Sequence, residues 1–310
     1  MTLTFRNYVN TVDKVQMLKL AHSTAGTNLH LIDLPYRLSS WTFDHPANVA
    51  LWHDKNGALC AWAALQTPFW ALDYCYLPDD PTLHPTILAW ADEQARKLVT
   101  RTGDYEGGRP CWFVNVFPDQ TERIADLEQF GFACQSDVGE NSWSKLFMRL
   151  AAVAEPSALA LPAGFSVRPL AGEAEASAYV ALHQAAFQSK SMTIDWRKRT
   201  LQHPAYRPNL DLVVEASNGE LAAFCICWFT QSGFDGQPAG QIEPLGVAEQ
   251  YHRHGLGRAI LLEGIRRLRA QGAQNIYVET DNYRDAAMAL YEAVGFRVHK
   301  DVLVYRKDYA

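Results

Sequence analysis

The sequence predicts a protein of the α/β class, made of two consecutive copies of a mixed sheet with helices on both faces. Three observations support this: the length, a set of features that recurs at matched spacings, and the order of strand-like and helix-like segments. A chain of 310 residues exceeds the usual size of one domain, so two domains of about 150 residues are expected. A hydrophobic content of 48% supplies apolar side chains for two cores.

The two halves begin alike. A first strand carries Phe5-Arg6 in one half and Val167-Arg168 in the other, and fifty residues after each arginine comes Asn56-Gly57 or Asn218-Gly219. Asn-Gly between apolar runs is the strongest short-range signal of a β-hairpin. Hairpins are therefore predicted with strands at 49–52 and 59–65, and at 212–216 and 221–229.

The two halves also end alike. In each, a predicted helix runs into Gly-Phe, at Gly131-Phe132 and Gly295-Phe296, and a terminal strand follows at about 144–150 and 298–307. Between the halves, residues 151–163 are rich in Ala and Pro and lack a periodic pattern, which indicates a linker. We therefore expect domains at residues 1–150 and 164–310.

Composition argues against several partners. The net charge of −6 gives no electrostatic reason to expect nucleic acid or an anionic membrane. No basic region followed by an apolar run opens the chain, and no apolar stretch approaches the roughly 18 residues of a membrane span, so a cytoplasmic protein is expected. The six cysteines lack metal-ligand spacing, so no metal site is expected, and Cys225 and Cys227 are predicted to be small buried hydrophobes.

The segment from Gln241 to Phe296 carries the strongest functional signal. A hydrophobic strand leads into a glycine-containing loop at the start of a helix that is predicted to reach about Gln271. Gly255 and Gly257 let the backbone approach a ligand closely, and the helix directs unsatisfied N–H groups and the positive end of its dipole toward it. This arrangement predicts an anion cradle, with a pyrophosphate as the expected ligand.

The matching segment of the first half lacks this chemistry. Residues 76–85 contain no glycine, two acids and three prolines. Prolines remove N–H donors and carboxylates repel phosphate. Leu127 also stands where the second half has Tyr291. The first domain is therefore predicted to be non-catalytic.

These residues resemble the GNAT superfamily of acyl-CoA-dependent N-acetyltransferases. In that family a strand ending in Leu-x-Val precedes Gln/Arg-x-x-Gly-x-Gly/Ala at a helix start, and a later helix ends in Leu-Tyr-x-x-x-Gly-Phe. The chain has Leu245-Gly246-Val247, then His252 to Gly257, then Leu290 to Phe296. The resemblance covers residues 164–307 and, through the repeat, implies two tandem GNAT-like domains in the arrangement of mycothiol synthase-like proteins, the first of them degenerate.

By this resemblance the chain binds acetyl-CoA as a co-substrate. The backbone of the first motif would pair with the pantetheine arm, and the loop would hold the pyrophosphate. His252 stands at the usual Gln/Arg position, where the adjacent Arg253 can supply the positive charge. Asn282 is a further candidate, although it precedes Tyr291 by nine positions, which exceeds the usual interval. The candidate cofactor-binding residues are Leu245, Gly246, Val247, His252, Arg253, His254, Gly255, Leu256, Gly257, Arg258 and Asn282.

Tyr291 and Glu243 are the candidate catalytic residues. A phenol with a pKa of about 10 is protonated at neutral pH and can donate to the departing sulfur. The alternative is an ordinary helix residue with its hydroxyl at the surface. Glu243 is the candidate general base, acting directly or through water, because a carboxylate in an apolar strand is costly to bury. The alternative for Glu243 is a structural role, at a sheet edge or in an ion pair. Gln241 lies on the same face but cannot act as a base.

The acceptor site has three candidates from the region between the first strand and the hairpin of the second domain. The resemblance implies that this region forms the acceptor wall, which makes Trp196, His203 and Tyr206 candidates, with loop packing as the alternative. His183 and His22 occupy similar places in the two halves and are expected to serve helix packing.

The leading hypothesis is an acetyl-CoA-dependent N-acetyltransferase with one active site, in the C-terminal domain. An acetyl group would pass by direct attack in a ternary complex to a primary amine of a small molecule or a peptide. There are two alternatives: a non-catalytic acyl-CoA sensor, and an enzyme that uses another acyl donor or an oxygen acceptor. The sequence leaves open the acceptor and whether the protein is a monomer or a homodimer.

Overall fold

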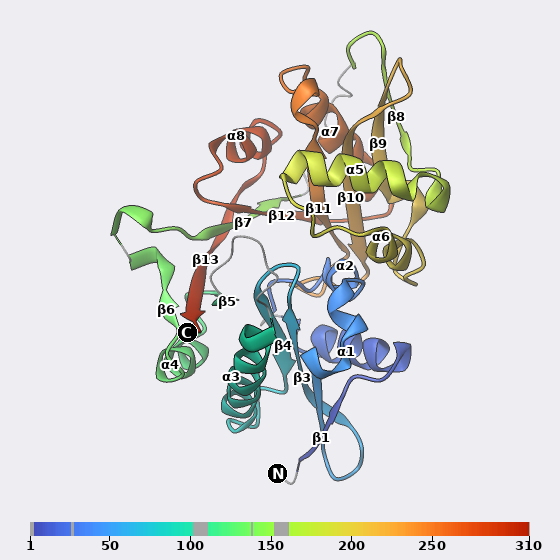
Figure 1. The fold of residues 1–310 in the computed structure, drawn as a ribbon. Coiled ribbons are helices and arrows are strands. Elements are labelled where there is room, and N and C mark those ends of the chain that lie inside the picture. The colour runs from blue at the N-terminus through green and yellow to red at the C-terminus, as the bar shows by residue number, and fades with distance from the viewer. Residues whose placement is uncertain (1–2, 26–27, 102–110, 138, 152–160, 310) are drawn as a thin grey trace. The chain divides into compact units, whose positions relative to one another are not determined.

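A computed structural model describes residues 3–25, 28–101, 111–137, 139–151 and 161–309 (Figure 1). The chain divides into two compact units. Unit 1 comprises residues 1–31, 40–145 and 300–310, and unit 2 comprises residues 32–39 and 146–299. The predicted linker at 151–163 lies mostly outside the described residues, and the domain boundaries at 150 and 164 stay predictions.

Unit 1 is built on a mixed sheet. Its elements are β1 (Thr4–Asn7), α1 (Thr11–Ser23), β2 (Val49–His53), β3 (Leu59–Gln66), β4 (Ala71–Tyr76), α3 (Leu83–Arg101), β5 (Cys111–Val116), α4 (Thr121–Gln129), β6 (Ala133–Cys134) and most of β13 (Arg297–Asp308). The strands lie in the order β1-β2-β3-β4-β5-β13, with β6 beside β13. Neighbours pair antiparallel except β4 and β5, which are parallel. The first strand, the hairpin and the helix before Gly131 that the sequence predicts for the first half are present as β1, β2 with β3, and α4.

Unit 2 contains the second mixed sheet. Its elements are α2 (Leu34–Arg37), β7 (Lys145–Leu150), β8 (Phe165–Pro169), α5 (Ala176–Phe187), α6 (Ile194–Leu201), β9 (Asp211–Ala216), β10 (Leu221–Thr230), β11 (Ala239–Val247), α7 (Leu256–Ala270), β12 (Asn275–Asp281) and α8 (Asp285–Ala293). The strands lie in the order β7-β12-β11-β10-β9-β8. Strands β8 to β11 pair antiparallel, whereas β11 and β12 are parallel.

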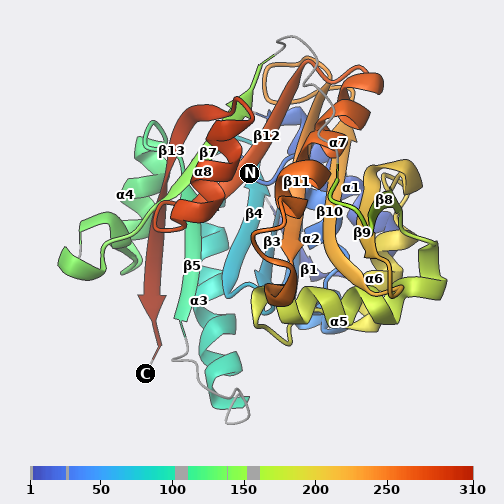
Figure 2. The same ribbon diagram turned by 90° about the horizontal axis from the view of Figure 1, so that it is seen from above.

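Helices α5 and α7 cover opposite faces of the unit 2 sheet (Figure 2). A Cβ at Gly264 of α7 would lie 2.8 Å from the Cys227 sulfur, so this glycine lets the helix pack closely on β10. On the other face, a Cβ at Gly246 would lie 3.1 Å from the Ala186 side chain of α5. Cys225 and Cys227 are buried in the core beneath α7, as predicted.

The two hairpins predicted from Asn-Gly are confirmed. β2 pairs with β3, and β9 pairs with β10, both antiparallel. The turn glycines Gly57 and Gly219 have φ angles of +81° and +83°, in the left-handed region that favours glycine. The local sequence alone was therefore sufficient to place these strands.

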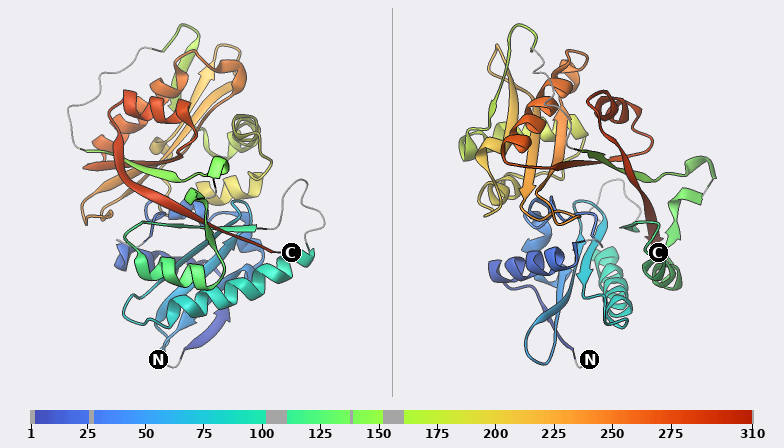
Figure 3. Two further views of the ribbon diagram at one scale, coloured as in Figure 1. Left: turned by 90° about the vertical axis from the view of Figure 1, so that its left-hand side faces the viewer. Right: turned by 180° about the vertical axis from the view of Figure 1, so that it is seen from behind.

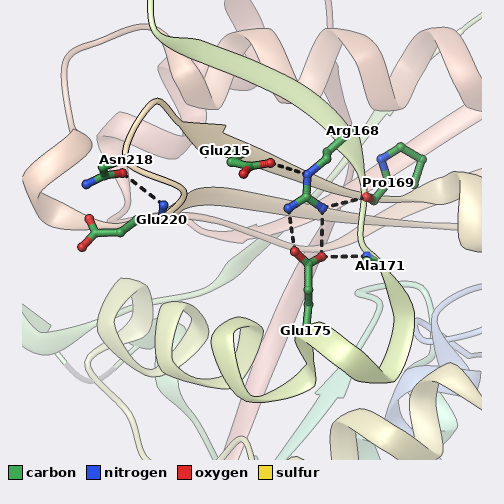
Figure 4. A network of polar contacts seen from close by, with 7 residues as sticks. All are labelled: Arg168, Pro169, Ala171, Glu175, Glu215, Asn218 and Glu220. Carbon is green, nitrogen blue, oxygen red and sulfur yellow. Dashed lines mark hydrogen bonds and ion pairs between the residues drawn. The ribbon is translucent and has the colours of Figure 1, made fainter.

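The internal repeat extends to an ion pair that the sequence comparison did not single out. Arg6 binds Asp13, seven residues later, at 2.6 Å, and Arg168 binds Glu175, again seven residues later, at 2.6 Å. Figure 4 shows the second pair, in which Arg168 also contacts Glu215. The same contact therefore fixes the first strand to the following helical segment in both units.

Two segments belong to the unit formed mainly by the other half of the sequence. Residues 32–39, which include α2, belong to unit 2, and residues 300–310, which include most of β13, belong to unit 1. Strand β13 continues as one long strand toward the C-terminus (Figure 3) and pairs with β5 from Leu303 opposite Val116 to Asp308 opposite Cys111. The predicted terminal strands exist as β7 and β13, but the sequence did not indicate these partners.

Candidate active site

Strands β11 and β12 diverge within the unit 2 sheet. They pair only where Ala239–Gln241 lies beside Asn275–Tyr277. Among the described residues, no pairing between them continues toward Val247 and Asp281, where the strands end. On the side away from β10, the backbone groups of residues 245–247 are therefore available to an extended partner, apart from the Val247 carbonyl oxygen, which contacts the His252 ring.

A β-bulge interrupts β11 at the start of this opening. Where β10 contributes Ile226 alone, β11 contributes both Glu243 and Pro244. Such a bulge re-aims side chains and releases backbone groups from the ladder. The Glu243 carbonyl accepts a hydrogen bond of 2.8 Å from Trp228 Nε1. Trp228 therefore holds the backbone of the candidate base in place.

The predicted glycine loop joins β11 to α7. Gly255 is the N-cap of α7 and has a φ of +75°, which favours glycine. His252 Nε2 lies 3.0 Å from the Val247 carbonyl oxygen, and His254 Nδ1 lies 2.9 Å from the His252 carbonyl oxygen. The His252 ring therefore contacts the end of β11 and the His254 ring braces the loop internally, roles that the sequence did not predict for them.

This loop has the chemistry of an anion site. The first N–H groups of α7 lack intrahelical partners, and the helix dipole adds positive potential there. Arg253 and Arg258 lie in the same segment, and both are exposed. A Cβ at Gly257 would lie 3.4 Å from the Val247 side chain, so a larger residue would crowd the end of β11. The loop thus fits the pyrophosphate that the sequence predicted.

Tyr291 lies on α8 and is buried in the core of unit 2. Its ring packs at an angle against Phe296, with centroids 5.8 Å apart. Burial, and then the charge of Glu243, raise the pKa of Tyr291 above its ordinary value. The phenol therefore keeps its proton at neutral pH, as a general acid must.

Glu243 acts electrostatically on three buried tyrosines. Burial is the largest cause of the raised pKa of Tyr36, Tyr179 and Tyr291, and the charge of Glu243 adds to it at each. Glu243 itself is only partly buried. The carboxylate of Glu243 thus lies near three tyrosines whose phenols stay protonated.

Tyr36 is a residue that the sequence analysis missed. Its hydroxyl lies 3.4 Å from Nε2 of His183, and its ring centroid lies 5.1 Å from that of Trp196. Trp196 Nε1 also donates to the Tyr36 carbonyl at 3.2 Å. Tyr36 and His183 are 147 positions apart, and no local pattern in residues 32–39 signals this contact.

His183 belongs to the buried face of α5, as predicted. Its ring stacks on Phe224, with centroids 5.4 Å apart. Burial, and then the nearby charge of Arg197, lower the pKa of His183 to about 3. The ring is therefore neutral at physiological pH.

The three acceptor candidates have different contacts, in a turn, in the core and with a buried ion pair. Trp196 is buried against Tyr36, whereas His203 Nδ1 accepts the Ala205 N–H at 3.1 Å within a turn. Tyr206 donates at 2.7 Å to Asp211, whose carboxylate pairs with the buried Arg197. These contacts favour packing for His203 and Tyr206, and an acceptor role for all three stays a prediction.

Asn282 follows β12 directly and is exposed. The neighbouring Asp281 forms an ion pair of 2.7 Å with Arg284. A contact between Asn282 and a cofactor stays a prediction.

The sequence of unit 2 matches a known family. Residues 176–296 match the model of the acetyltransferase (GNAT) family. This part of the chain is a GNAT domain. A mycothiol acetyltransferase of Kineococcus radiotolerans is 38% identical over 141 residues, which cover 44% of this chain and 44% of that protein. The chain thus spans about half the length of the curated relatives that it matches.

Solved GNAT structures cover both units. A GCN5-related N-acetyltransferase from Sphaerobacter thermophilus covers 99% of this chain and 95% of its own, with a TM-score of 0.65 and 17% identity. A tandem GNAT protein from the clavulanic acid biosynthesis pathway covers 99% and 98%, with a TM-score of 0.64 and 16% identity. At these identities the likeness concerns the fold, which is that of tandem GNAT domains, as the sequence predicted.

Unit 1 keeps the GNAT framework but differs in its side chains. The described pairing of β4 with β5 is confined to Ala71 and Phe113, so a similar divergence exists there. Leu127 of α4 is fully buried, and Arg123 of the same helix lies over the rings of Tyr74 and Tyr76, 5.2 and 4.7 Å from their centroids. Aromatic and cationic packing therefore occupies this part of unit 1.

The described residues provide neither a membrane-spanning helix nor a cluster of metal ligands. Within that part of the chain, no helix is long and apolar enough to cross a bilayer. The same residues contain no group of three or more His, Cys, Asp or Glu side chains placed to hold a metal ion.

Proposed function

We propose that this protein is an acetyl-CoA-dependent N-acetyltransferase whose one active site lies in unit 2, within the predicted domain 164–310. The proposal is supported by three features of unit 2 taken together. Among the described residues, the edge of β11 is unpaired near its end, an anion-binding loop follows it, and the protonated phenol of Tyr291 lies near the carboxylate of Glu243. The predicted domain 1–150 would be non-catalytic, because residues 76–85 lack glycine and Leu127 replaces the tyrosine.

The residues present fit acetyl-CoA. The freed backbone of residues 245–247 can pair with the amide groups of a pantetheine arm as an added strand would. The start of α7, with Arg253 and Arg258, suits the pyrophosphate. When bound, acetyl-CoA supplies an activated acyl group.

Glu243 and Tyr291 would carry the proton transfers. Glu243, directly or through water, accepts the proton that an ammonium group must lose before its nitrogen can attack a carbonyl carbon. Tyr291 holds a proton at its phenolic oxygen, ready for the sulfur that leaves when the carbon–sulfur bond breaks. On attack the nitrogen would lose its second proton, which restores the phenol of Tyr291, so the new amide bond, the broken carbon–sulfur bond and the free thiol balance without a covalent enzyme intermediate.

Amine-dependent release of CoA tests the proposal. Purified protein is incubated with acetyl-CoA and a panel of primary amines, and both free thiol and acetylated amine are measured. We expect release only in the presence of an amine, with one acetylated product per thiol. Acetyl-CoA binding without release of CoA would favour an acyl-CoA sensor. Release of CoA from other acyl-CoA donors, or with alcohols, would favour an enzyme with another acyl donor or an oxygen acceptor.

A further inference from the structure

We propose that Gln241 determines acceptor specificity by hydrogen-bonding a neutral polar group, such as a hydroxyl or a carboxamide, that the amine carries near its amino group. This inference rests on the proposed function and narrows its acceptor class.

The observation behind it is an unsatisfied buried amide. Gln241 is 0% exposed, and neither its Oε1 nor its Nε2 has a hydrogen-bond partner among the described residues. Leaving such a group unpaired is costly, and buried polar groups that lack partners are uncommon. The equally buried Gln66 of β3 shows the usual solution, because its Oε1 accepts a 2.7 Å hydrogen bond from the Ser40 hydroxyl.

The position of Gln241 along β11 places it beyond the acyl group. The strand leads into the anion-binding loop, which would hold the pyrophosphate. A pantetheine arm bound along the edge of β11 would therefore run from Val247 back toward Glu243, a distance of about 13 Å for four residues. Gln241 lies two residues further, at the last pair with β12 before the strands diverge. It therefore lies further along β11 than Glu243, on the side of the acyl group from which the acceptor would approach.

Gln241 projects to the same side of the sheet as Glu243. Its neighbour Gly240 faces α7, since a Cβ there would lie 2.7 Å from the Leu268 side chain, and Ile242 also packs in the core beneath α7. Alternation along the strand then directs Gln241 toward the α5 face. The bulge keeps Glu243 on that face as well.

The surroundings of Gln241 are aromatic and mostly neutral. It lies opposite Trp228, whose indole N–H is already committed to the Glu243 carbonyl. The Trp228 ring lies 6.5 Å from that of Tyr36, which in turn contacts the neutral His183. A group that both donates and accepts would satisfy both atoms of the amide, whereas a carboxylate would leave Oε1 unpaired and face the charge of Glu243.

Matched amine pairs test the recognition. The wild-type protein is assayed with 2-aminoethanol against n-propylamine, and with glycinamide against glycine, using the same acetyl-CoA concentration. We expect kcat/KM to favour the neutral polar member of each pair by about tenfold or more. In Gln241→Met, which keeps the length of the side chain, that ratio should fall toward one, while Gln66→Met should leave it unchanged.

The stability of the free protein supplies a readout that needs no substrate. Gln66→Met removes a satisfied hydrogen bond and should lower Tm, whereas Gln241→Met removes an unsatisfied amide and should hold or raise Tm. Equal turnover of both members of each pair, or a loss of Tm in Gln241→Met as large as in Gln66→Met, would overturn the role of Gln241. Failure of the proposed function looks different, because no amine would then release CoA from either variant or from the wild type.

Discussion

In the proposed mechanism, Glu243 and the tyrosines near it would have opposite roles in proton transfer. The tyrosines stay protonated because burial and the carboxylate both raise their pKa. They can therefore donate a proton but cannot compete with Glu243 as a base. The proposed direction of proton transfer, to Glu243 and from Tyr291, is consistent with these shifts in pKa.

Replacing Tyr291 by Phe should separate chemistry from binding. The ring and its packing on Phe296 remain, so the affinity for acetyl-CoA should stay within about twofold, while kcat falls by about a hundredfold or more. Steady-state kinetics and calorimetric titration measure the two quantities. Tyr305→Phe removes a buried hydroxyl that donates to Glu128 in unit 1 and should leave kcat unchanged. An unchanged kcat in Tyr291→Phe would remove this residue from the mechanism.

His183 should make the protein less stable in acid. Its pKa of about 3 in the folded state lies below the unfolded value of about 6.5, so the unfolded chain binds the proton first as the pH falls. Stability is therefore lost progressively below pH 6.5 and down to about pH 3. Between pH 7 and 4.5 this residue should account for about 2–3 kcal/mol of the free energy of unfolding.

Urea unfolding of wild type and His183→Asn at both pH values isolates that contribution. The variant should lose less stability on acidification than the wild type. If both lose the same amount, His183 is not buried in its neutral form.

The sequence indicated candidate residues that a local pattern marks, but not those that only tertiary structure brings near them. Tyr291 stands at a fixed place before Gly295-Phe296, and Glu243 is a carboxylate in an apolar strand. Tyr36 reaches His183 from a distant segment, so no local pattern could reveal it. Gln241 was set aside because it cannot act as a base, and its unpaired amide becomes visible only once its neighbours are placed.

The β11–loop–α7 element was predictable because its signals are adjacent in sequence. The glycines, the helix start and the apolar stripe of α7 lie within one continuous segment. The bulge and the divergence from β12 were not predicted, because both depend on pairing with other strands. Those two features position the freed edge that the proposed function needs.

Gly255→Ala should weaken acetyl-CoA binding through the backbone. A left-handed φ costs a residue with a Cβ about 1–2 kcal/mol, so the loop should relax away from its present conformation. Gly272, just past the end of α7, has a φ of +92° and open space around it, so Gly272→Ala carries a similar backbone cost. Thermal unfolding should show comparable losses of Tm in both variants, whereas titration should show weaker acetyl-CoA binding only in Gly255→Ala. Equal affinities in the two variants would contradict an anion-binding role for the loop.

Across the whole chain, the repeat was predictable but the exchange of segments was not. Matched spacings reveal two copies of one framework, since they need only comparison of the two halves. The pairing partner of a terminal strand depends on the sheet edge beside which it lies. The local sequences of β7 and β13 do not indicate these partners. Each unit consequently contains a segment from the other half of the sequence.

A fragment of residues 161–310 should not fold stably, although it carries the GNAT segment. It lacks residues 32–39, so Trp196 and Arg199 lose the carbonyl oxygens of Tyr36 and Ser39 that their side chains bind. Its β13 also loses β5 as a partner. Circular dichroism and urea titration should show no cooperative transition, and adding a fragment of residues 1–151 should restore one. A fragment that unfolds cooperatively with the Tm of the full chain would contradict the assignment of residues 32–39 to unit 2.

The number of acetyl-CoA molecules bound per chain tests the central claim most directly, because that claim assigns a single working site to unit 2. Calorimetric titration of the full chain should give one site. In Gly257→Asp that site should be lost, since an acid at the start of α7 suits the helix dipole but repels phosphate. Two sites in the wild type, or one site that survives in Gly257→Asp with α7 intact, would contradict the account.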